Sequence, residues 1–305
     1  MKRKKVGLAL SGGAALGFAH IGVIKVLLQN NIPIDVISGT SMGALVGGVF
    51  ASGMSIEDME NVLQNFSRKN FVDINPFILT DGLLHGKKVT DLLRKLVGDK
   101  KIEDCNKKYC EIASDLHSGE KYVFTKGDIV TAIRSSISIP GVFKPVKIDK
   151  MCLVDGGTHD NLPVGEARKL GADIVIGVDV CSSYKRPTSL KNTIDILLAS
   201  VNTLIASFVQ SQPDKGDIYI QINQPGVTVA KFSADEAIKS VEYGEKYAKE
   251  FLPQIKQKLL EAGIEIKPLK KVKVKKTKKL EKKEDNKEKP VAPEVIESNA
   301  EDIKN

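Results

Sequence analysis

Short apolar runs alternate with stretches of helical period along most of this 305-residue chain. The run 174–180 (IVIGVDV) is almost continuously apolar, which is typical of a strand covered on both faces. Apolar residues recur at helical spacing in 18–29, 190–210 and 233–262. This alternation predicts a layered α/β domain. Further strands are expected at Val6–Leu10, 36–38, 111–115, 122–125 and 218–222.

The composition changes after Gly263, where Lys, Glu, Pro and Asn become dominant. We therefore expect one folded domain over 1–265 and a Lys/Glu-rich, disordered tail over 266–305. Residues 267–305 hold 13 Lys and 8 acidic residues, which is +5 of the chain's net +8. The basic half of the tail has no aromatic residue to stack on bases, so no nucleic-acid partner is expected. Contact with an anionic membrane is the alternative to a simple solvated tail.

The expected strand 36–38 continues through GTSMG into the helical run Met42–Ala51. This is the G-x-S-x-G pattern in the strand–turn–helix setting of a serine nucleophile. Gly39 and Gly43 flank Ser41 at positions where a side chain would collide in so sharp a turn. We expect Ser41 to be the nucleophile, held at the positive end of the next helix. A tight turn with an incidental serine is the alternative.

A glycine-rich loop, 11–17 (SGGAALG), follows the first expected strand. Its consecutive N–H groups suit an anion, either a bound phosphate or the oxyanion of an ester attack. A dinucleotide site would need glycine at position 14, although Asp35 has the spacing of a ribose-binding acid. The lysine of a P-loop is missing from the loop. We therefore expect the amides of Gly12, Gly13 and Ala14 to form an oxyanion hole.

A carboxylate is expected to serve the serine from the segment after the apolar run 152–154. Asp155 follows this run, and Gly156 and Gly157 let the chain turn away with little steric bulk. An aspartate in a partly apolar site has a raised pKa and can accept the serine proton directly. An Asp–Gly hairpin turn is the structural alternative. His159 is the rival base, in a Ser–His–Asp triad.

The glycine loop, GTSMG and DGG, in this order, resemble the motifs of the patatin-like phospholipases, bacterial members in particular. AHIGVIKVL after the loop and AIRSSISIPGVFKPV before DGG also match. So does the segment NLPV, in which Asn161 and Pro163 suit an N-cap and an early proline of a helix. The resemblance extends from about Lys5 to about Leu260.

This resemblance implies a three-layer α/β/α sandwich with a mainly parallel central sheet. It also implies hydrolysis of a lipid or fatty-acyl ester, as by a phospholipase, lysophospholipase or esterase, with no metal or cofactor. Carried over, Ser41 becomes acylated, Asp155 moves the proton, and Gly12, Gly13 and Ala14 hold the oxyanion. An acyltransferase with the same acyl-enzyme and a regulatory protein with little turnover are the alternatives.

The loop departs from the family's usual Gly–Gly–Gly–x–Arg/Lys–Gly at two positions. Ala14 replaces the third glycine, and its N–H remains usable if the backbone φ there is negative. Leu16 replaces the basic residue, so a cation that would assist a phosphate head group is missing.

The cellular location of the protein is predicted from two features, the length of its apolar runs and the spacing of its cysteines. No apolar run approaches the ~20 residues that span a bilayer, and the four cysteines have no CxxC spacing, as in free thiols of a reducing compartment. We expect a cytoplasmic protein, with peripheral contact at the inner membrane surface as a further option. The apolar stripe of 190–210 is expected to pack in the core, and an acyl-chain groove or a membrane-facing lid is the alternative.

Overall fold

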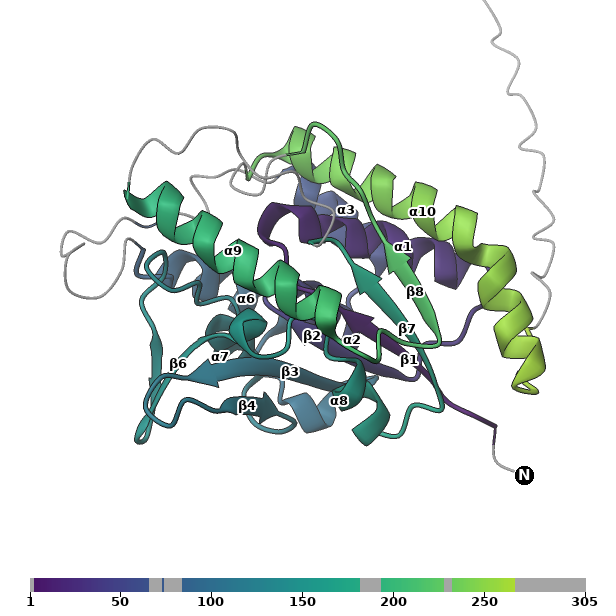
Figure 1. Ribbon diagram of the computed structural model, residues 1–305, viewed down its shortest axis with the longest axis horizontal. Coiled ribbons are helices and arrows are strands. Elements are labelled where there is room, and N and C mark those ends of the chain that lie inside the picture. The colour runs from purple at the N-terminus through teal and green to yellow at the C-terminus, as the bar shows by residue number, and fades with distance from the viewer. Residues whose placement is uncertain (1–2, 66–72, 74–83, 182–192, 228–231, 267–305) are drawn as a thin grey trace, which may run out of the picture. The chain divides into compact units, whose positions relative to one another are not determined.

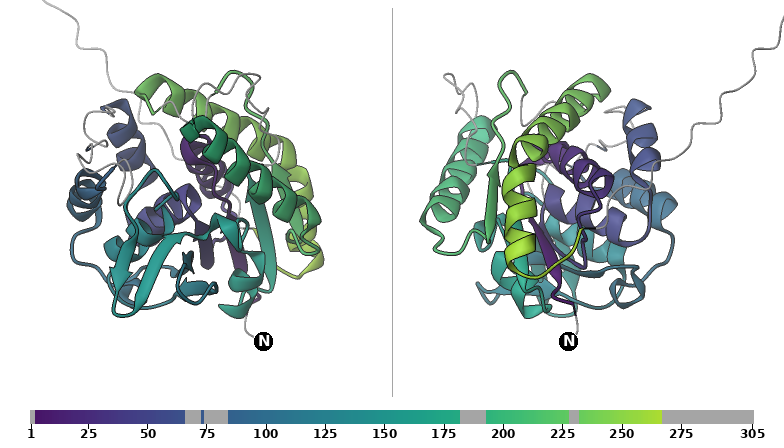
Figure 2. Two further views of the ribbon diagram at one scale, coloured as in Figure 1. Left: turned by 60° about the vertical axis from the view of Figure 1, so that its left-hand side comes forward. Right: turned by 90° about the vertical axis from the view of Figure 1, so that its right-hand side faces the viewer.

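The computed structural model describes residues 3–65, 73, 84–181, 193–227 and 232–266. Over these residues a central sheet carries helices on both faces (Figures 1 and 2). The expected three-layer α/β/α fold is therefore confirmed. Apart from its first residue, the predicted tail lies outside the described residues.

The sheet has the strand order β5-β6-β3-β2-β1-β7-β8, and β4, off this path, pairs with β3. Strands β3, β2, β1, β7 and β8 are mutually parallel, whereas β4 and β6 run antiparallel to β3, so the sheet is mainly parallel as expected. The strands are β1 (Val6–Leu10), β2 (Val36–Thr40), β3 (Lys108–Asp115), β4 (Lys121–Phe124), β5 (Val146–Ile148), β6 (Met151–Asp155), β7 (Ile174–Asp179) and β8 (Ile218–Gln221).

The helices form two layers with separate cores. The larger layer consists of α1 (Ala19–Gln29), α2 (Met42–Ala51), α3 (Ile56–Gln64), α6 (Lys87–Val97), α7 (Ile129–Ser136) and α10 (Ala234–Glu261). The smaller layer consists of α8 (Val164–Lys169) and α9 (Thr193–Ser211), on the opposite face of the sheet (Figure 2). Short 3-10 turns are η1 (Ala14–Phe18), η2 (Ile102–Asp104) and η3 (Gly156–Thr158).

All six expected strands are present, although 36–38 and 111–115 are parts of longer strands. The helix expected at 233–262 is α10, whose first turn is capped by the Ser233 hydroxyl accepting from the Glu236 N–H. The sequence did not indicate α3, α6, α7 or β5. Helix α6 was missed although Val89, Leu92, Leu93, Leu96 and Val97 recur at helical spacing. Helix α7 and strand β5 are short, with 8 and 3 residues.

The stripe expected to pack in the core over 190–210 does so only in part. In α9, Val209 is buried, whereas Ile196, Leu204 and Phe208 are 52%, 57% and 51% exposed. Leu204 and Phe208 belong to the stripe, and the expectation of core packing is wrong for these two side chains, because α9 lies at the outside of the smaller layer (Figure 1). Residues 190–192 lie outside the described residues.

Helices α1 and α10 pack closely at two glycines. A Cβ atom on Gly22 would lie 2.1 Å from the Val241 carbonyl oxygen, and one on Gly244 would lie 1.9 Å from the Ala19 carbonyl oxygen.

We expect Gly244→Ala to lower the free energy of unfolding by about 1–3 kcal/mol, because the helices must separate. Thermal denaturation measures this loss. Gly165→Ala in α8, where a Cβ meets nothing within 4 Å, is the control and should not lower the midpoint. Equal midpoints for the two variants would contradict the close packing.

Candidate active site

Ser41 lies in a strained turn between β2 and α2. Its backbone has φ 54° and ψ −121°, a conformation that non-glycine residues rarely adopt. The Ser41 N–H donates to the Ser136 Oγ atom at 2.9 Å, and the Ser136 hydroxyl donates to the Ile112 carbonyl oxygen at 2.6 Å. These bonds fix the turn against α7 and β3, and they leave the Ser41 side chain only 6% exposed.

The glycines on either side of Ser41 allow its turn to pack. A Cβ on Gly43 would lie 2.3 Å from the Leu10 carbonyl oxygen, and one on Gly39 would lie 2.5 Å from the Gly43 carbonyl oxygen. Any other residue at these positions would push the turn away from the end of β1.

Asp155 ends β6 and reaches the same point. The Ser41 hydroxyl hydrogen-bonds its carboxylate, and the Gly157 N–H donates to its Oδ1 atom at 2.8 Å. Burial raises the pKa of Asp155 to about 6, although both hydrogen bonds act to lower it. The structure therefore brings together the two residues predicted to form the dyad. A carboxylate with this pKa can accept the proton of a serine hydroxyl near neutral pH.

The glycines after Asp155 lead into η3 rather than into a hairpin turn. A Cβ on Gly156 would lie 2.4 Å from the Ile112 carbonyl oxygen in β3. Gly156 is therefore the residue that lets β6 end close enough to β3 for Asp155 to face Ser41.

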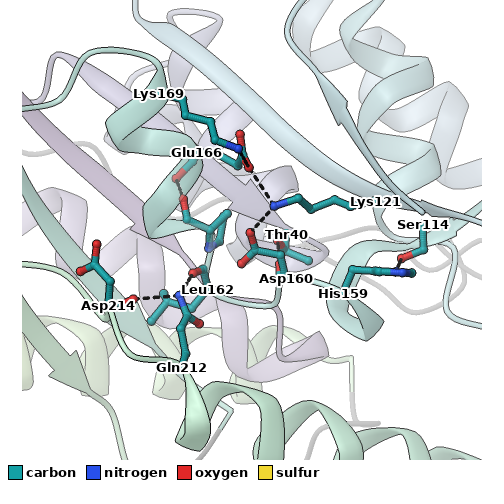
Figure 3. Close-up of polar contacts among 12 residues, drawn as sticks. Thr40, Ser114, Lys121, His159, Asp160, Leu162, Glu166, Lys169, Gln212 and Asp214 are labelled. Atoms are coloured by element: carbon teal, nitrogen blue, oxygen red, sulfur yellow. Dashed lines mark hydrogen bonds and ion pairs between the residues drawn. The ribbon is translucent and has the colours of Figure 1, made fainter. Parts of the chain in front are cut away.

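His159, the rival base, hydrogen-bonds elsewhere (Figure 3). The residue is exposed. Its ring nitrogens form hydrogen bonds with the Ser114 hydroxyl at 2.7 Å and the Gly119 carbonyl oxygen at 2.9 Å. His20 is fully buried and bonds the Ser11 carbonyl oxygen at 2.8 Å, and burial lowers its pKa to about 4. Neither ring takes part in the hydrogen bond between the serine and the aspartate.

The glycine loop passes beside Ser41, but one of its three expected oxyanion donors is already hydrogen-bonded. A Cβ on Gly12 would lie 3.0 Å from the Ser41 Cβ atom. The Gly12 N–H, however, donates to the Asn161 carbonyl oxygen at 3.1 Å, so this amide is not offered to an oxyanion. The N–H groups of Gly13 and Ala14 have no acceptor among the described residues.

The condition placed on Ala14, a negative φ, is not met, because its φ is 48°; its N–H nevertheless has no acceptor among the described residues. Alanine in this left-handed region costs roughly 1–2 kcal/mol. The residue begins η1, so its N–H is one of the first-turn donors that a helix leaves unpaired. Leu16, which replaces the family's basic residue, is 1% exposed and points away from solvent.

Asn161 is a site residue that the sequence assigned to the wrong role. It does not cap α8, whose N-cap is Pro163 with no side-chain cap bond. Its Oδ1 atom lies 2.5 Å from the position of a Cβ on Gly12 and 3.0 Å from that of a Cβ on Gly157. The Nδ2 atom is buried without an acceptor in the described part of the chain. An unpaired donor here is free for an oxygen of a substrate.

Polar contacts hold the segment that follows Asp155 in place (Figure 3). The Lys121 ammonium bridges Asp160 at 2.9 Å and Glu166 at 2.8 Å. The Thr40 hydroxyl, next to Ser41, donates to the Asp160 carbonyl oxygen at 2.7 Å. Gln212, just beyond α9, donates to the Leu162 carbonyl oxygen at 2.9 Å. These contacts connect the segment to β2, β4 and the end of α9.

An apolar pocket begins at the residue next to the nucleophile and runs along α2. Met42, Val46 and Val49 line it on one side, at the i, i+4, i+7 spacing of a single helix face. Met59 and Leu63 of α3, and side chains of α6, line the other side. All of its lining side chains are apolar. Its lining is suited to a hydrocarbon group, and Met42 is the lining residue adjacent to the dyad in sequence.

A serine on a strand–turn–helix elbow, hydrogen-bonded to a buried aspartate at the strand ends of an α/β sheet, is the arrangement of a serine acyl hydrolase. The chain belongs to the patatin-like phospholipase family, whose model matches residues 8–168, more than half of its length.

Similar proteins agree with this placement. An uncharacterized NTE family protein of Mycobacterium tuberculosis is 38% identical over 184 residues, which cover 60% of this chain and 51% of that protein. The lysophospholipase NTE1 of Candida albicans is 34% identical over 186 residues, which cover 60% of this chain and 13% of that protein. This chain thus spans about half the length of the mycobacterial relative and a small part of the fungal one.

Among solved structures, VipD from Legionella pneumophila has the same fold. Its TM-score is 0.53 at 15% identity, and the match covers 83% of this chain and 67% of VipD. In the part of this chain that the structure describes, no helix is long and apolar enough to cross a membrane.

The raised pKa of Asp155 predicts how stability depends on pH. Because the folded state binds this proton more tightly than the unfolded state, the ionised carboxylate costs stability above pH 6, and this cost is lost as the pH falls towards 4. Asp155→Asn keeps an acceptor for Gly157 and removes the charge. We expect the variant to be more stable than the wild type by about 3 kcal/mol at pH 7.5.

Urea unfolding of both proteins at pH 7.5 and pH 4 measures this difference. The gain should shrink strongly at pH 4, where the unfolded carboxyl also becomes protonated. A variant that is less stable at pH 7.5, or a gain of equal size at both pH values, would contradict the burial of an ionisable carboxyl at this position.

Proposed function

We propose that this chain is a serine lipid acyl hydrolase that works through a Ser41–Asp155 dyad and an acyl-enzyme. One observation carries the proposal: a buried serine hydroxyl, on a backbone with positive φ, is hydrogen-bonded to a carboxylate whose pKa is raised to about 6. Family membership and the similarity to a lysophospholipase support a lipid ester as the substrate. A lysophospholipid is the substrate class that we favour.

In the first half of the reaction, the Ser41 oxygen attacks the ester carbonyl carbon while Asp155 takes the hydroxyl proton. The carbonyl oxygen becomes an oxyanion, and the N–H groups of Gly13 and Ala14 stabilise it. Each such donor is worth roughly 2.7–4 kcal/mol of barrier. Asp155 then gives its proton to the alcohol oxygen as the carbon–oxygen bond breaks, which leaves Ser41 acylated.

In the second half, water replaces the alcohol. Asp155 takes a proton from the water, whose oxygen attacks the acyl carbon, and it returns the proton to the Ser41 oxygen as the fatty acid leaves. The same group acts as base and then as acid in both halves. A pKa near 6 suits both roles better than the ordinary aspartate value of about 3.9.

The dyad is tested with a fluorescent alkyl phosphonate, which reacts with activated serines. The probe should label the wild type and not Ser41→Ala. Asp155→Asn should slow labelling by about 10²–10⁴-fold, because the general base is lost. His159→Ala is the matched control and should be labelled at the wild-type rate, since its ring bonds Ser114 and Gly119. Persistent labelling of Ser41→Ala would sink the proposal, and loss of labelling in His159→Ala would restore the triad.

The acyl chain is placed in the apolar pocket along α2. Val46 lies one helical turn beyond Met42, roughly 6 Å along the helix axis. Val46→Phe should block the pocket past this point. We expect the kcat/KM for long-chain nitrophenyl esters to fall at least tenfold, because methylenes beyond the block lose their apolar contacts. The acetate ester, measured on the same protein, is the internal control and should be hydrolysed as before. An equal loss for both esters would show that the chain lies elsewhere.

A further inference from the structure

Helix α9 presents large apolar side chains to solvent along one face. Ile196, Leu204 and Phe208 are 52%, 57% and 51% exposed. They lie at multiples of four residues, so they share a side of the helix with Ser200, which is also exposed. An exposed apolar face of this kind on a folded domain marks a contact surface.

The hydroxyls of α9 that lie on or beside its exposed stripe are satisfied within the helix. Asp195, in the first turn, is the only charged residue in the sequence of Thr193–Ser211. The hydroxyls of Ser200, Thr203 and Ser207 donate to carbonyl oxygens four residues earlier, at 2.8, 2.8 and 3.0 Å. Hydroxyls bonded in this way need no water. The stripe can therefore leave water without leaving its hydroxyl donors unpaired.

The opposite face of α9 contacts the domain beside the candidate active site. Val209 is buried in the smaller core, against residues of α8 and β7. The Ile205 Cδ1 atom lies 3.0 Å from the position of a Cβ on Gly157, two residues after Asp155. Figure 2 shows α9 as the outermost helix on its side of the sheet. Helix α9 therefore contacts the turn that follows Asp155.

We propose that the outer face of α9 docks this protein on a lipid surface, with the Ile196, Leu204 and Phe208 side chains inserted among the acyl chains. A lipid surface fits better than a second copy of the chain, because protein interfaces have a polar rim. The exposed stripe of α9 offers only hydroxyls that are already bonded to its own carbonyls. An interfacial helix inserts an apolar face among the acyl chains, and the stripe of Ile196, Leu204 and Phe208 supplies such a face.

The docking proposal goes beyond the proposed function. It rests on the proposed function only for the reason why the protein would bind a lipid surface. Docked through α9, the protein would receive its ester substrate from the surface that the helix touches. Binding can be measured without turnover, on the Ser41→Ala variant. A failure of docking and a failure of catalysis are therefore distinguishable.

The experiment is co-sedimentation of full-length Ser41→Ala protein with phosphatidylcholine vesicles. These vesicles carry no net charge, so the Lys-rich tail contributes little to binding. Adding Leu204→Gln and Phe208→Gln should weaken the partition constant roughly tenfold or more, because two apolar side chains no longer enter the lipid. Glutamine keeps a good helix propensity and adds no charge.

The matched control places the same two changes on α10, as Ile238→Gln and Leu260→Gln. These side chains are 40% and 68% exposed, so the control loses comparable apolar surface far from α9 in sequence. Its partition constant should equal that of the parent. Thermal denaturation of the three proteins checks that each remains folded, which is expected because all four positions are exposed.

Three results would overturn the docking proposal. They are no binding of the parent to the vesicles, equal weakening by the α9 and α10 changes, and unchanged binding of the α9 variant. Sedimentation velocity gives a further test: a parent that dimerises, and that the α9 changes convert to a monomer without altering vesicle binding, would assign this face to a second copy. Hydrolysis of a soluble acetate ester by the otherwise wild-type α9 variant should be unchanged. If the wild type itself does not hydrolyse this ester, the result counts against the proposed function and leaves the docking proposal unaffected.

Discussion

Three hydrogen bonds to backbone carbonyls connect the parts of the chain that meet at the ends of β1, β2 and β6. The Gly12 N–H donates to Asn161, the Thr40 hydroxyl to Asp160 and the Ser38 hydroxyl to Pro163. They tie segment 160–163 to the glycine loop and to the strand that carries the nucleophile. Asp155 lies at the other end of η3 from this segment. The bonds therefore fix the end of the turn that carries the carboxylate, while Asp155 itself bonds the Ser41 hydroxyl and the Gly157 N–H.

The site concentrates features that work against stability. Ser41 and Ala14 both have positive φ, which costs of order 1–3 kcal/mol each. Asp155 is buried with a raised pKa, and the Asn161 side chain has an unpaired buried donor. A chain selected for stability alone would remove all four. They persist because the surrounding sheet and helices over-determine the backbone, and their presence at one point is physical support for a functional site.

The sequence predicts what depends on local pattern. The bounds of α2 and the steric need for Gly39 and Gly43 follow from the pentapeptide and its setting. Hydrogen bonds to backbone carbonyl oxygens could not be predicted from the sequence, because every residue has such an oxygen. The Gly12 amide was therefore assigned to the oxyanion, although it bonds Asn161. Helical period likewise identifies the stripe of α9 but not what covers it, because a core and a lipid surface select the same side chains.

The groups around the proposed reaction indicate how a substrate would be selected. Under the proposed function, the N–H groups of Gly13 and Ala14 would bind an ester oxygen, and no polar head group is needed for that contact. At the position of the family's basic residue, Leu16 is buried and brings no charge. Two apolar features remain: the exposed stripe of α9 on one face of the sheet, and the pocket along α2 on the other. Under the proposed function both would contact the acyl part of a lipid, so the acyl chain, rather than the charge of the head group, should determine which lipid is hydrolysed.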